Sequence, residues 1–140
     1  MNSAQLPRPL LREFRRPAIW LAGWGALFLL IAIGSLLPAG ELPTVSNGFD
    51  KVEHFLGYAL LSAYAVMLFE RMRPQALAAL GVIAFGIAIE FAQSAWTADR
   101  LGDSADAMAN ALGALAGLCV TATPMARWLQ RIDARLASGT

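Results

Sequence analysis

One uninterrupted apolar run, residues 18–37, constrains what this chain can fold into more than any other feature. The run reads AIWLAGWGALFLLIAIGSLL and holds no ionisable side chain. About 20 such residues in a helix cross a hydrocarbon core about 30 Å thick, and a helix satisfies its own backbone there. The run exceeds the apolar region of about 7–15 residues in a secretory signal peptide. It therefore predicts a retained membrane span that ends at Pro38.

Three more apolar segments follow, at residues 52–69, 76–96 and 105–123. The polar sequence 70–75 is short enough to join two antiparallel helices. Segment 105–123 is built largely of alanine and glycine, so it is the least apolar of the four segments. With 57% apolar and only 15% charged residues, the chain is far from the composition of a soluble domain. We expect an all-α membrane protein, a bundle of four transmembrane helices.

The basic residues are distributed unevenly around these spans. Lys and Arg collect on the cytoplasmic side of membrane proteins. With four spans, Lys51 and Arg100 fall on one side and nine arginines on the other. The nine are Arg8, Arg12, Arg15, Arg16, Arg71, Arg73, Arg127, Arg131 and Arg135. We therefore expect both termini in the cytoplasm, with a basic N-terminus at 1–17, a membrane domain at 18–123 and a basic amphipathic tail at 124–140.

The second segment carries a polar stripe near its predicted outer end. Asp50, His54 and Tyr58 follow at i, i+4 and i+8, which places them on one helical face, and Lys51 lies beside them. Ionisable groups that face lipid are costly, so such groups normally face a bundle interior or an aqueous cavity and mark functional sites.

The third and fourth segments carry similar stripes. Glu90 and Gln93 share a face of the third, and Glu90 is the deepest acid in the chain. The fourth carries Asp103, Asp106, Asn110, Gly113 and Gly117 on one stripe. Small residues such as these glycines allow two helices to approach closely. Because the chain direction alternates, all three stripes lie toward the outer half of the membrane, and we expect one outward-facing pocket.

The candidate catalytic residues are Glu90, His54 and Asp106. The candidate binding residues are Asp50, Lys51, Tyr58, Gln93, Arg100, Asp103 and Asn110. Structural roles remain as alternatives, because Asp50 and Asp103 can cap helices, and Asp106 and Asn110 can hydrogen-bond neighbouring helices. These acids and the single histidine can ligate a divalent ion, but one histidine fits no standard zinc pattern. No metal site and no cofactor is predicted.

The three motifs together resemble the VanZ-like family of small bacterial membrane proteins. The residues that carry the resemblance are Asp50, Lys51, His54, Phe55 and Tyr58, then Glu90 and Gln93, then Arg100, Asp103, Asp106, Asn110, Gly113 and Gly117. They span roughly residues 34–120. The resemblance implies a multi-pass protein of the bacterial inner (cytoplasmic) membrane that acts in the cell envelope, with a link to resistance to the glycopeptide antibiotic teicoplanin.

Three classes of function stay open. The first is an enzyme or modifying factor that acts on a lipid-linked or cell-wall precursor, with Glu90 and His54 as an acid–base pair. The second is a non-catalytic binder of a lipid head group, a drug or a cation. The third is an ion-coupled transporter subunit. The expected partners are membrane lipids or a lipid-linked envelope precursor; no nucleic acid is expected, and a homo-oligomer is left open.

Overall fold

The computed structural model describes residues 9–37, 49–96 and 103–139. The helices are α1 (Pro17–Leu36), α2 (Phe49–Leu68), α3 (Met72–Trp96), α4 (Ser104–Leu118), the short 3-10 helices η2 (Cys119–Ala122) and η3 (Pro124–Arg127), and α5 (Trp128–Ser138). No β-strand occurs within these ranges; one isolated bridge joins Leu11 to Phe69. The predicted all-α class is confirmed.

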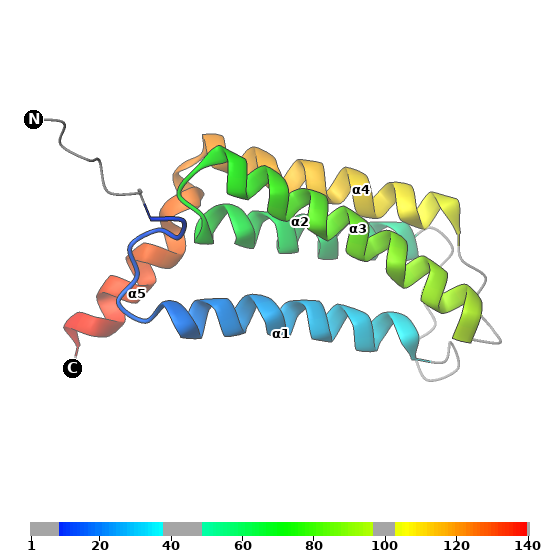
Figure 1. Ribbon diagram of the computed structural model, residues 1–140, viewed down its shortest axis with the longest axis horizontal. Helices are drawn as coiled ribbons and strands as arrows, with labels where there is room; N and C mark the ends of the chain where they lie inside the picture. Colours follow the sequence, from blue (N-terminus) through cyan, green and yellow to red (C-terminus); the bar gives the residue numbers. More distant parts are fainter. Residues whose placement is uncertain (1–8, 38–48, 97–102, 140) are drawn as a thin grey trace, which may run out of the picture.

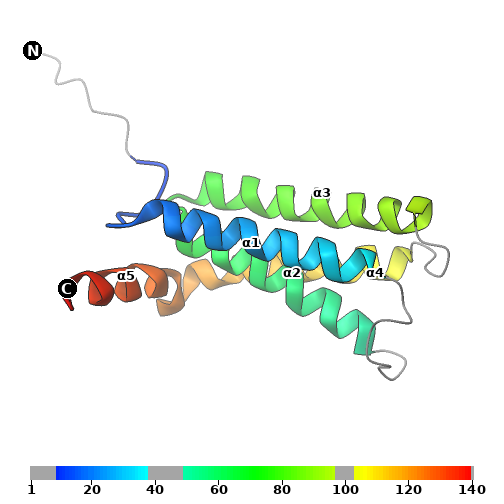
Figure 2. The same ribbon diagram turned by 90° about the horizontal axis from the view of Figure 1, so that it is seen from below.

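Helices α1 to α4 run side by side along the long axis of the molecule (Figures 1 and 2), and each runs opposite to the one before it. α5 lies at the end where α1 begins, and the turn between α2 and α3 lies at the same end. The C-terminal ends of α1 and α3 and the N-terminal ends of α2 and α4 therefore meet at the opposite end, which we call the distal end.

Three of the described helices are long and apolar enough to cross a membrane: α1, α3 and the continuous segment Ser104–Ala122. α2 is not among them, although the fourth segment is the one that we expected to be least apolar. The reason is local, because Asp50, Lys51, Glu53 and His54 occupy the first two turns of α2. The remainder of that helix is largely apolar, and half of its residues are buried, mostly from Leu61 onward.

α3 begins earlier than the sequence pattern indicates, at Met72, so the predicted polar turn at 70–75 is shorter than expected. Pro74 falls in the first helical turn, where its missing N–H leaves no helical hydrogen bond unmade. Gln75 is buried, and its Nε2 donates to the carbonyl oxygen of Phe69 at 2.8 Å. This hydrogen bond gives the Phe69 carbonyl oxygen a donor in the short connection between α2 and α3, in place of water.

α2 and α4 form the most extensive contact between helices. A Cβ atom on Gly113 would overlap the carbonyl oxygen of Phe55, and one on Gly117 would overlap that of Ala59. The predicted close approach along the glycine stripe is thus confirmed. Packing at this distance stabilises helix pairs in lipid, where apolar burial supplies little driving force.

α1 contacts α2 and α3 less extensively than α2 contacts α4, and it does so mainly through aromatic side chains. Trp24 contacts Phe28 with ring centroids 5.2 Å apart, and Phe28 contacts Phe85 of α3 at 4.9 Å, both edge-on. The indole Nε1 of Trp24 donates to the carbonyl oxygen of Leu61 at 3.0 Å. Ser35 is the only buried residue of α1. Most of α1 therefore presents an apolar surface, as a lipid-facing helix does.

We call the end opposite the distal end the proximal end. Buried charged groups hold separate segments of the chain together there. Arg12 donates to Glu70 Oε2 at 2.8 Å and to the carbonyl oxygen of Val66 at 3.3 Å. Asp133 of α5 is 3% exposed and accepts from the backbone N–H of Arg15 at 2.5 Å and from Trp20 Nε1 at 2.9 Å. These contacts hold the N-terminal segment and α5 against the bundle.

Candidate functional site

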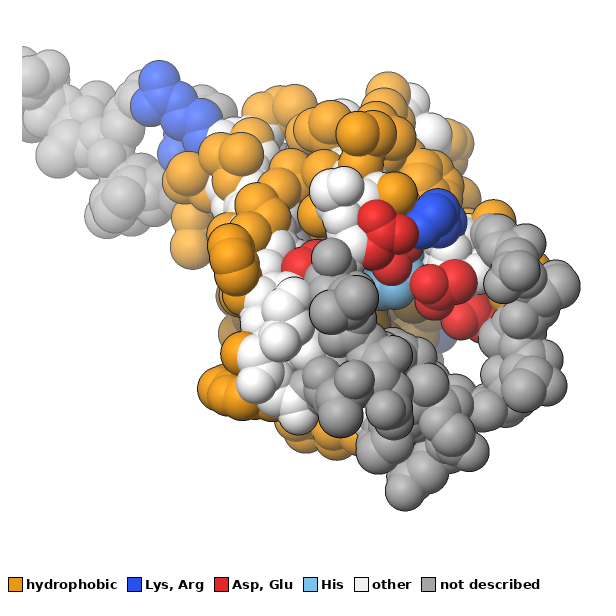
Figure 3. Space-filling model, turned by 90° about the vertical axis from the view of Figure 1, so that its right-hand side faces the viewer, with side chains coloured by type: hydrophobic (Ala, Val, Ile, Leu, Met, Phe, Trp, Pro, Cys, Tyr) orange, Lys and Arg blue, Asp and Glu red, His pale blue; other side chains and the backbone are white. Residues whose placement is uncertain are grey.

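The polar stripes predicted from the sequence come together at the distal end. Figure 3 shows this end face, where acidic side chains gather with a basic side chain and a histidine, and hydrophobic side chains lie above and to the left of them. The described members come from the N-terminal ends of α2 and α4 and the C-terminal half of α3. Acids at the first turns of two helices also complement the helix dipoles.

Lys51 is held between two carboxylates of α4. Its Nζ lies 2.8 Å from Asp103 Oδ2 and 2.8 Å from Asp106 Oδ1. Asp103 also caps α4, because its Oδ1 accepts the backbone N–H of Ala105 at 2.8 Å. The hydrogen bond from Lys51, together with that from Ala105, holds the pKa of Asp103 below its usual value. Asp103 therefore has the structural role that we weighed as an alternative, and Lys51 is already paired.

A hydrogen-bonded relay joins the three helices behind this ion pair. Asn110 of α4 lies with Oδ1 3.0 Å from His54 Nδ1, and its Nδ2 lies 3.4 Å from Glu90 Oε1. The other oxygen of Glu90 accepts the backbone N–H of Asp103 at 3.1 Å. The amide nitrogen of Asn110 can only donate, and it donates to the carboxylate oxygen of Glu90. The amide oxygen then faces His54, so His54 Nδ1 carries a proton.

The second ring nitrogen of His54 faces two carboxylates without a hydrogen bond to either. Nε2 lies 3.7 Å from Asp50 Oδ1 and 4.0 Å from Asp106 Oδ2. Hydrogen bonds between such groups are about 2.7–3.2 Å long. Asp50 and His54 are one turn apart on α2, and Asp106 approaches from α4. The ligand atoms of these three residues all lie within 4.8 Å of one another.

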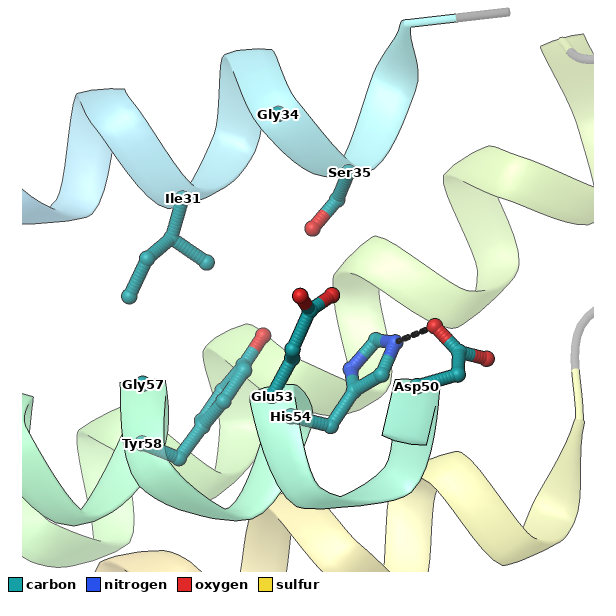
Figure 4. Close-up of a pocket in the computed structure, with 8 residues that line it drawn as sticks. All are labelled: Ile31, Gly34, Ser35, Asp50, Glu53, His54, Gly57 and Tyr58. Carbon is teal, nitrogen blue, oxygen red and sulfur yellow. Dashed lines mark ion pairs between the residues drawn. The ribbon is translucent and has the colours of Figure 1, made fainter. Parts of the chain in front are cut away.

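A cavity of about 230 Å³ opens between α1 and α2 beside this triad. Its lining consists of Ile31, Gly34, Ser35, Asp50, Glu53, His54, Gly57 and Tyr58. Figure 4 shows the Glu53 carboxylate and the Tyr58 hydroxyl directed toward the space between the two helices, with Ile31 and Ser35 on the opposite side. The lining is charged near the distal end and apolar deeper in.

Sequence reasoning did not select Glu53 or the lining residues of α1. Glu53 has a detectable signal, because it lies three residues after Asp50 and four before Gly57, on the same face of α2. The contribution of α1 has no such signal, because Gly34 and Ser35 carry no charge and only packing brings them to α2.

Tyr58 is the most enclosed polar residue of the cavity. Its side chain is 1% exposed, and its hydroxyl has no hydrogen-bond partner within the residues that the structure describes. A buried hydroxyl without a partner costs about 1–3 kcal/mol. Native proteins rarely leave such a group alone unless a water or a ligand fills the position.

Two predicted site residues stand apart. Gln93 is buried, but its Nε2 donates to the carbonyl oxygen of Ser35 at 2.9 Å and so links α3 to α1 behind the cavity. Arg100 lies outside the described residues. A second hollow of about 240 Å³ between α3 and α4 includes Glu90 and Asp103 in its lining. Glu90 thus lies between that hollow and the Asn110 relay.

The remaining predicted residues, namely Glu90, His54, Asp106, Asp50, Lys51, Tyr58, Asp103 and Asn110, lie in or next to this distal network. Comparison of the chain with protein-family models, with curated proteins and with solved structures returns no match.

Proposed function

We propose that this chain is a four-span protein of the bacterial cytoplasmic membrane with both termini in the cytoplasm. α2 is the fourth span in this proposal. It has as many residues as α1, 20 in each case, and runs beside the three apolar helices in the bundle (Figure 1). Its polar first turns face α4 and the cavity, which relieves the cost of charged groups in lipid. The excess of arginine at the proximal end supports the orientation.

We further propose that the distal cavity binds the polar head group of an envelope lipid or lipid-linked precursor from the outer leaflet. The observation that carries this function is the cavity itself, which combines charged groups near the membrane surface with an apolar wall from α1. Sites for small ligands combine an apolar lining with a few placed polar groups in this way. A head group enters the charged part, and its acyl or prenyl chain lies along the exposed apolar surface of α1.

The same geometry favours acid–base chemistry at His54. The relay through Asn110 to Glu90 orients the imidazole and leaves Nε2 facing the cavity, which is the arrangement of an oriented general base. Glu90 therefore supports His54 from behind rather than sharing a proton with it directly, and Asp106 faces the same nitrogen. The resemblance to the VanZ-like family makes a lipid-linked cell-wall precursor the favoured substrate class and teicoplanin susceptibility a suitable cellular readout.

The decisive experiment compares lipids and cell-wall precursors by mass spectrometry in cells with and without the gene. Wild type is expected to change the amount of at least one lipid-linked species, and His54→Ala and Glu90→Gln are expected to abolish the change while still inserting. Glu13→Gln is the matched control, because Glu13 is an exposed acid at the proximal end. Equal profiles with and without the gene would refute the proposal.

A non-catalytic binder is distinguished from an enzyme by binding a lipid without changing the lipids of the cell. In that case purified wild-type protein retains a co-purifying lipid that His54→Ala loses, although the cellular lipid profile does not change. Turnover predicts that both the bound lipid and the cellular profile depend on His54.

A further inference from the structure

We propose that Asp50, His54 and Asp106 bind one divalent first-row transition-metal ion, such as Mn²⁺ or Zn²⁺, at the mouth of the distal cavity. Three different side chains from two helices direct ligand atoms at one point, and all of these atoms lie within 4.8 Å of one another. Two carboxylates with one imidazole suit Mn²⁺ best, whereas Mg²⁺ and Ca²⁺ take oxygen ligands. Because one histidine is not a standard zinc pattern, Zn²⁺ serves here as the competing ion.

The separations around His54 fit ligands that surround an ion. Nε2 is 3.7 Å from Asp50 Oδ1 and 4.0 Å from Asp106 Oδ2. Ligand atoms about 2.1 Å from a tetrahedral ion lie about 3.4 Å from one another. To reach that separation the two distances from His54 must shorten by about 0.3 and 0.6 Å, and the distance between Asp50 and Asp106 by at most about 1.4 Å.

The hydrogen bonds behind His54 supply the support that a metal-bound histidine needs. Such a histidine nearly always donates its other ring N–H to a carboxylate or carbonyl oxygen, which sets its orientation. Here Nδ1 meets the amide oxygen of Asn110, whose nitrogen faces Glu90. His54 Nε2 therefore has its lone pair available on the side of Asp50 and Asp106. An ion at this position would occupy that lone pair, so His54 would then act as a ligand, and a water on the ion would take the place of His54 as the base. Asn110 and Glu90 are positioning residues in this site.

Lys51 leaves one oxygen of Asp106 for the ion. Its ammonium group pairs with Oδ1, while Oδ2 faces His54. The side chain of Asp106 is 12% exposed and that of His54 is 10% exposed. The Asp50 side chain is 57% exposed at the rim, but its ligand oxygen lies within 4.8 Å of that of Asp106, and like charges this close repel unless a cation lies between them. A divalent ion offsets both charges.

The Tyr58 hydroxyl is an independent sign that the cavity holds a ligand. It lines the same cavity as Asp50 and His54, is 1% exposed and lacks a partner within the described part of the chain. An ion held by three protein ligands keeps open positions for water or substrate oxygens. The hydroxyl and the Glu53 carboxylate line the cavity that these open positions would border.

An ion also explains how an acidic cavity accepts a phosphate-bearing head group. The described lining residues include two acids and no lysine or arginine. In this respect alone the inference rests on the proposed function: the ion would bridge the carboxylates of the protein and an oxygen of the head group. The ion site itself can be tested without any lipid substrate.

The test uses Mn²⁺ and the full chain in nanodiscs after treatment with a chelator. The electron paramagnetic resonance signal of free Mn²⁺ is expected to fall until one ion is bound per chain, and Zn²⁺ should compete. The bound ion should show magnetic coupling to one imidazole nitrogen. His54→Ala should abolish this coupling and, like Asp106→Asn, weaken binding at least tenfold. Asn110→Ala should weaken it by about 10–100-fold, as loss of an outer-shell partner does.

Glu13→Gln is the control and should bind as wild type does. Circular dichroism and elution as a single species show that each variant is folded. Absence of Mn²⁺ and Zn²⁺ binding to folded wild type at millimolar metal would refute the ion site, and so would equal affinity in wild type, His54→Ala and Asp106→Asn. If binding fails but Glu90→Gln still abolishes the lipid change in cells, the ion proposal falls and the proposed function stands.

Discussion

The two ends of the bundle both contain buried charged groups, but they use them in opposite ways. At the proximal end both oxygens of Asp133 accept hydrogen bonds, and Arg12 bonds a carboxylate and a carbonyl oxygen. At the distal end His54 Nε2 faces two carboxylates beyond hydrogen-bond distance, and the Tyr58 hydroxyl has no partner within the described residues. The proximal contacts join segments that are far apart in sequence, whereas the distal groups face a cavity.

This difference separates polar groups that hold a fold together from those that are kept for a ligand. A buried charge with all of its partners stabilises one arrangement, and removal of a partner is costly. A buried polar atom that faces a cavity without a partner destabilises the free protein and lowers the cost of ligand binding, because its solvation is already lost. Stability and function should therefore respond in opposite ways to substitutions at the two ends.

The largest effect is expected where α2 and α4 touch, because this contact supports the distal site. Gly113→Val would place side-chain atoms on the carbonyl oxygen of Phe55, next to His54. Backbone cannot yield as a side chain does, so we expect a loss of about 3 kcal/mol, the upper end of the usual cost of overpacking, together with loss of the site. Gly25→Val is the matched control, because a Cβ on Gly25 meets nothing within 4 Å. Equal resistance to proteolysis in both variants would contradict the observed packing.

The next largest effect is expected at the proximal end. Asp133→Ala leaves the Trp20 indole N–H and the Arg15 backbone N–H without their acceptor. Each lost partner costs about 1–3 kcal/mol, so unfolding in mixed micelles should become easier by about 3 kcal/mol. Asp50→Ala, at the exposed rim of the distal site, should change stability by less than about 1 kcal/mol. A larger loss of stability in Asp50→Ala than in Asp133→Ala would contradict the proposed difference between the two ends.

A smaller effect of opposite sign is expected inside the distal cavity. Tyr58→Phe removes a hydroxyl that has no described partner, so the free energy of unfolding should rise by about 1 kcal/mol while Mn²⁺ affinity or lipid turnover falls. Tyr64→Phe is the matched variant, because the Tyr64 hydroxyl donates to the carbonyl oxygen of Trp20 at 3.0 Å. It should lose about 1 kcal/mol and keep the activity of the site. If Tyr58→Phe is no more stable than wild type, the Tyr58 hydroxyl is satisfied without a ligand.

The smallest effect on stability is expected when the pH is lowered. Burial raises the pKa of Asp133, but hydrogen bonds from Trp20 and from the backbone of Arg15 and Arg16 outweigh it and hold the pKa below its usual value. The pKa is lower in the folded than in the unfolded chain, so the stabilisation is present above the unfolded pKa and is lost as pH falls through the folded pKa. Stability should therefore hold from neutral pH to about pH 4 and fall below it.

The two ends should differ in this acid response. The pKa of Asp103 is also lowered, chiefly by Lys51, but Asp103 is half-exposed, so its protonation should matter less. Unfolding measured between pH 7 and pH 3 should show a weaker acid dependence in Asp133→Ala than in wild type, while Asp103→Asn should follow wild type. The reverse order would place the acid-sensitive contact at the distal end.

Much of the distal site was predictable from helical periodicity alone. The spacing of Asp50, His54 and Tyr58 defines one face of α2, and the spacing of Asp106 and Asn110 defines one face of α4. Alternating chain direction then brings both faces to the same end. Periodicity did not separate the roles within the stripes, because Lys51 pairs with acids of α4 and Gln93 contacts α1 rather than the cavity.

The sequence by itself determined the long apolar helices, the polar stripes on them and the close contact along Gly113 and Gly117, because these depend on local composition and on the repeat of the helix. Only the tertiary structure decided that Asn110 lies between His54 and Glu90 and that Glu53 and Tyr58 share a cavity with α1. It also decided that both carboxylate oxygens of Asp133 accept hydrogen bonds at the proximal end. The physical reason is that a helix carries its faces in its sequence, whereas the rotation and depth at which two helices pack depend on every side chain between them.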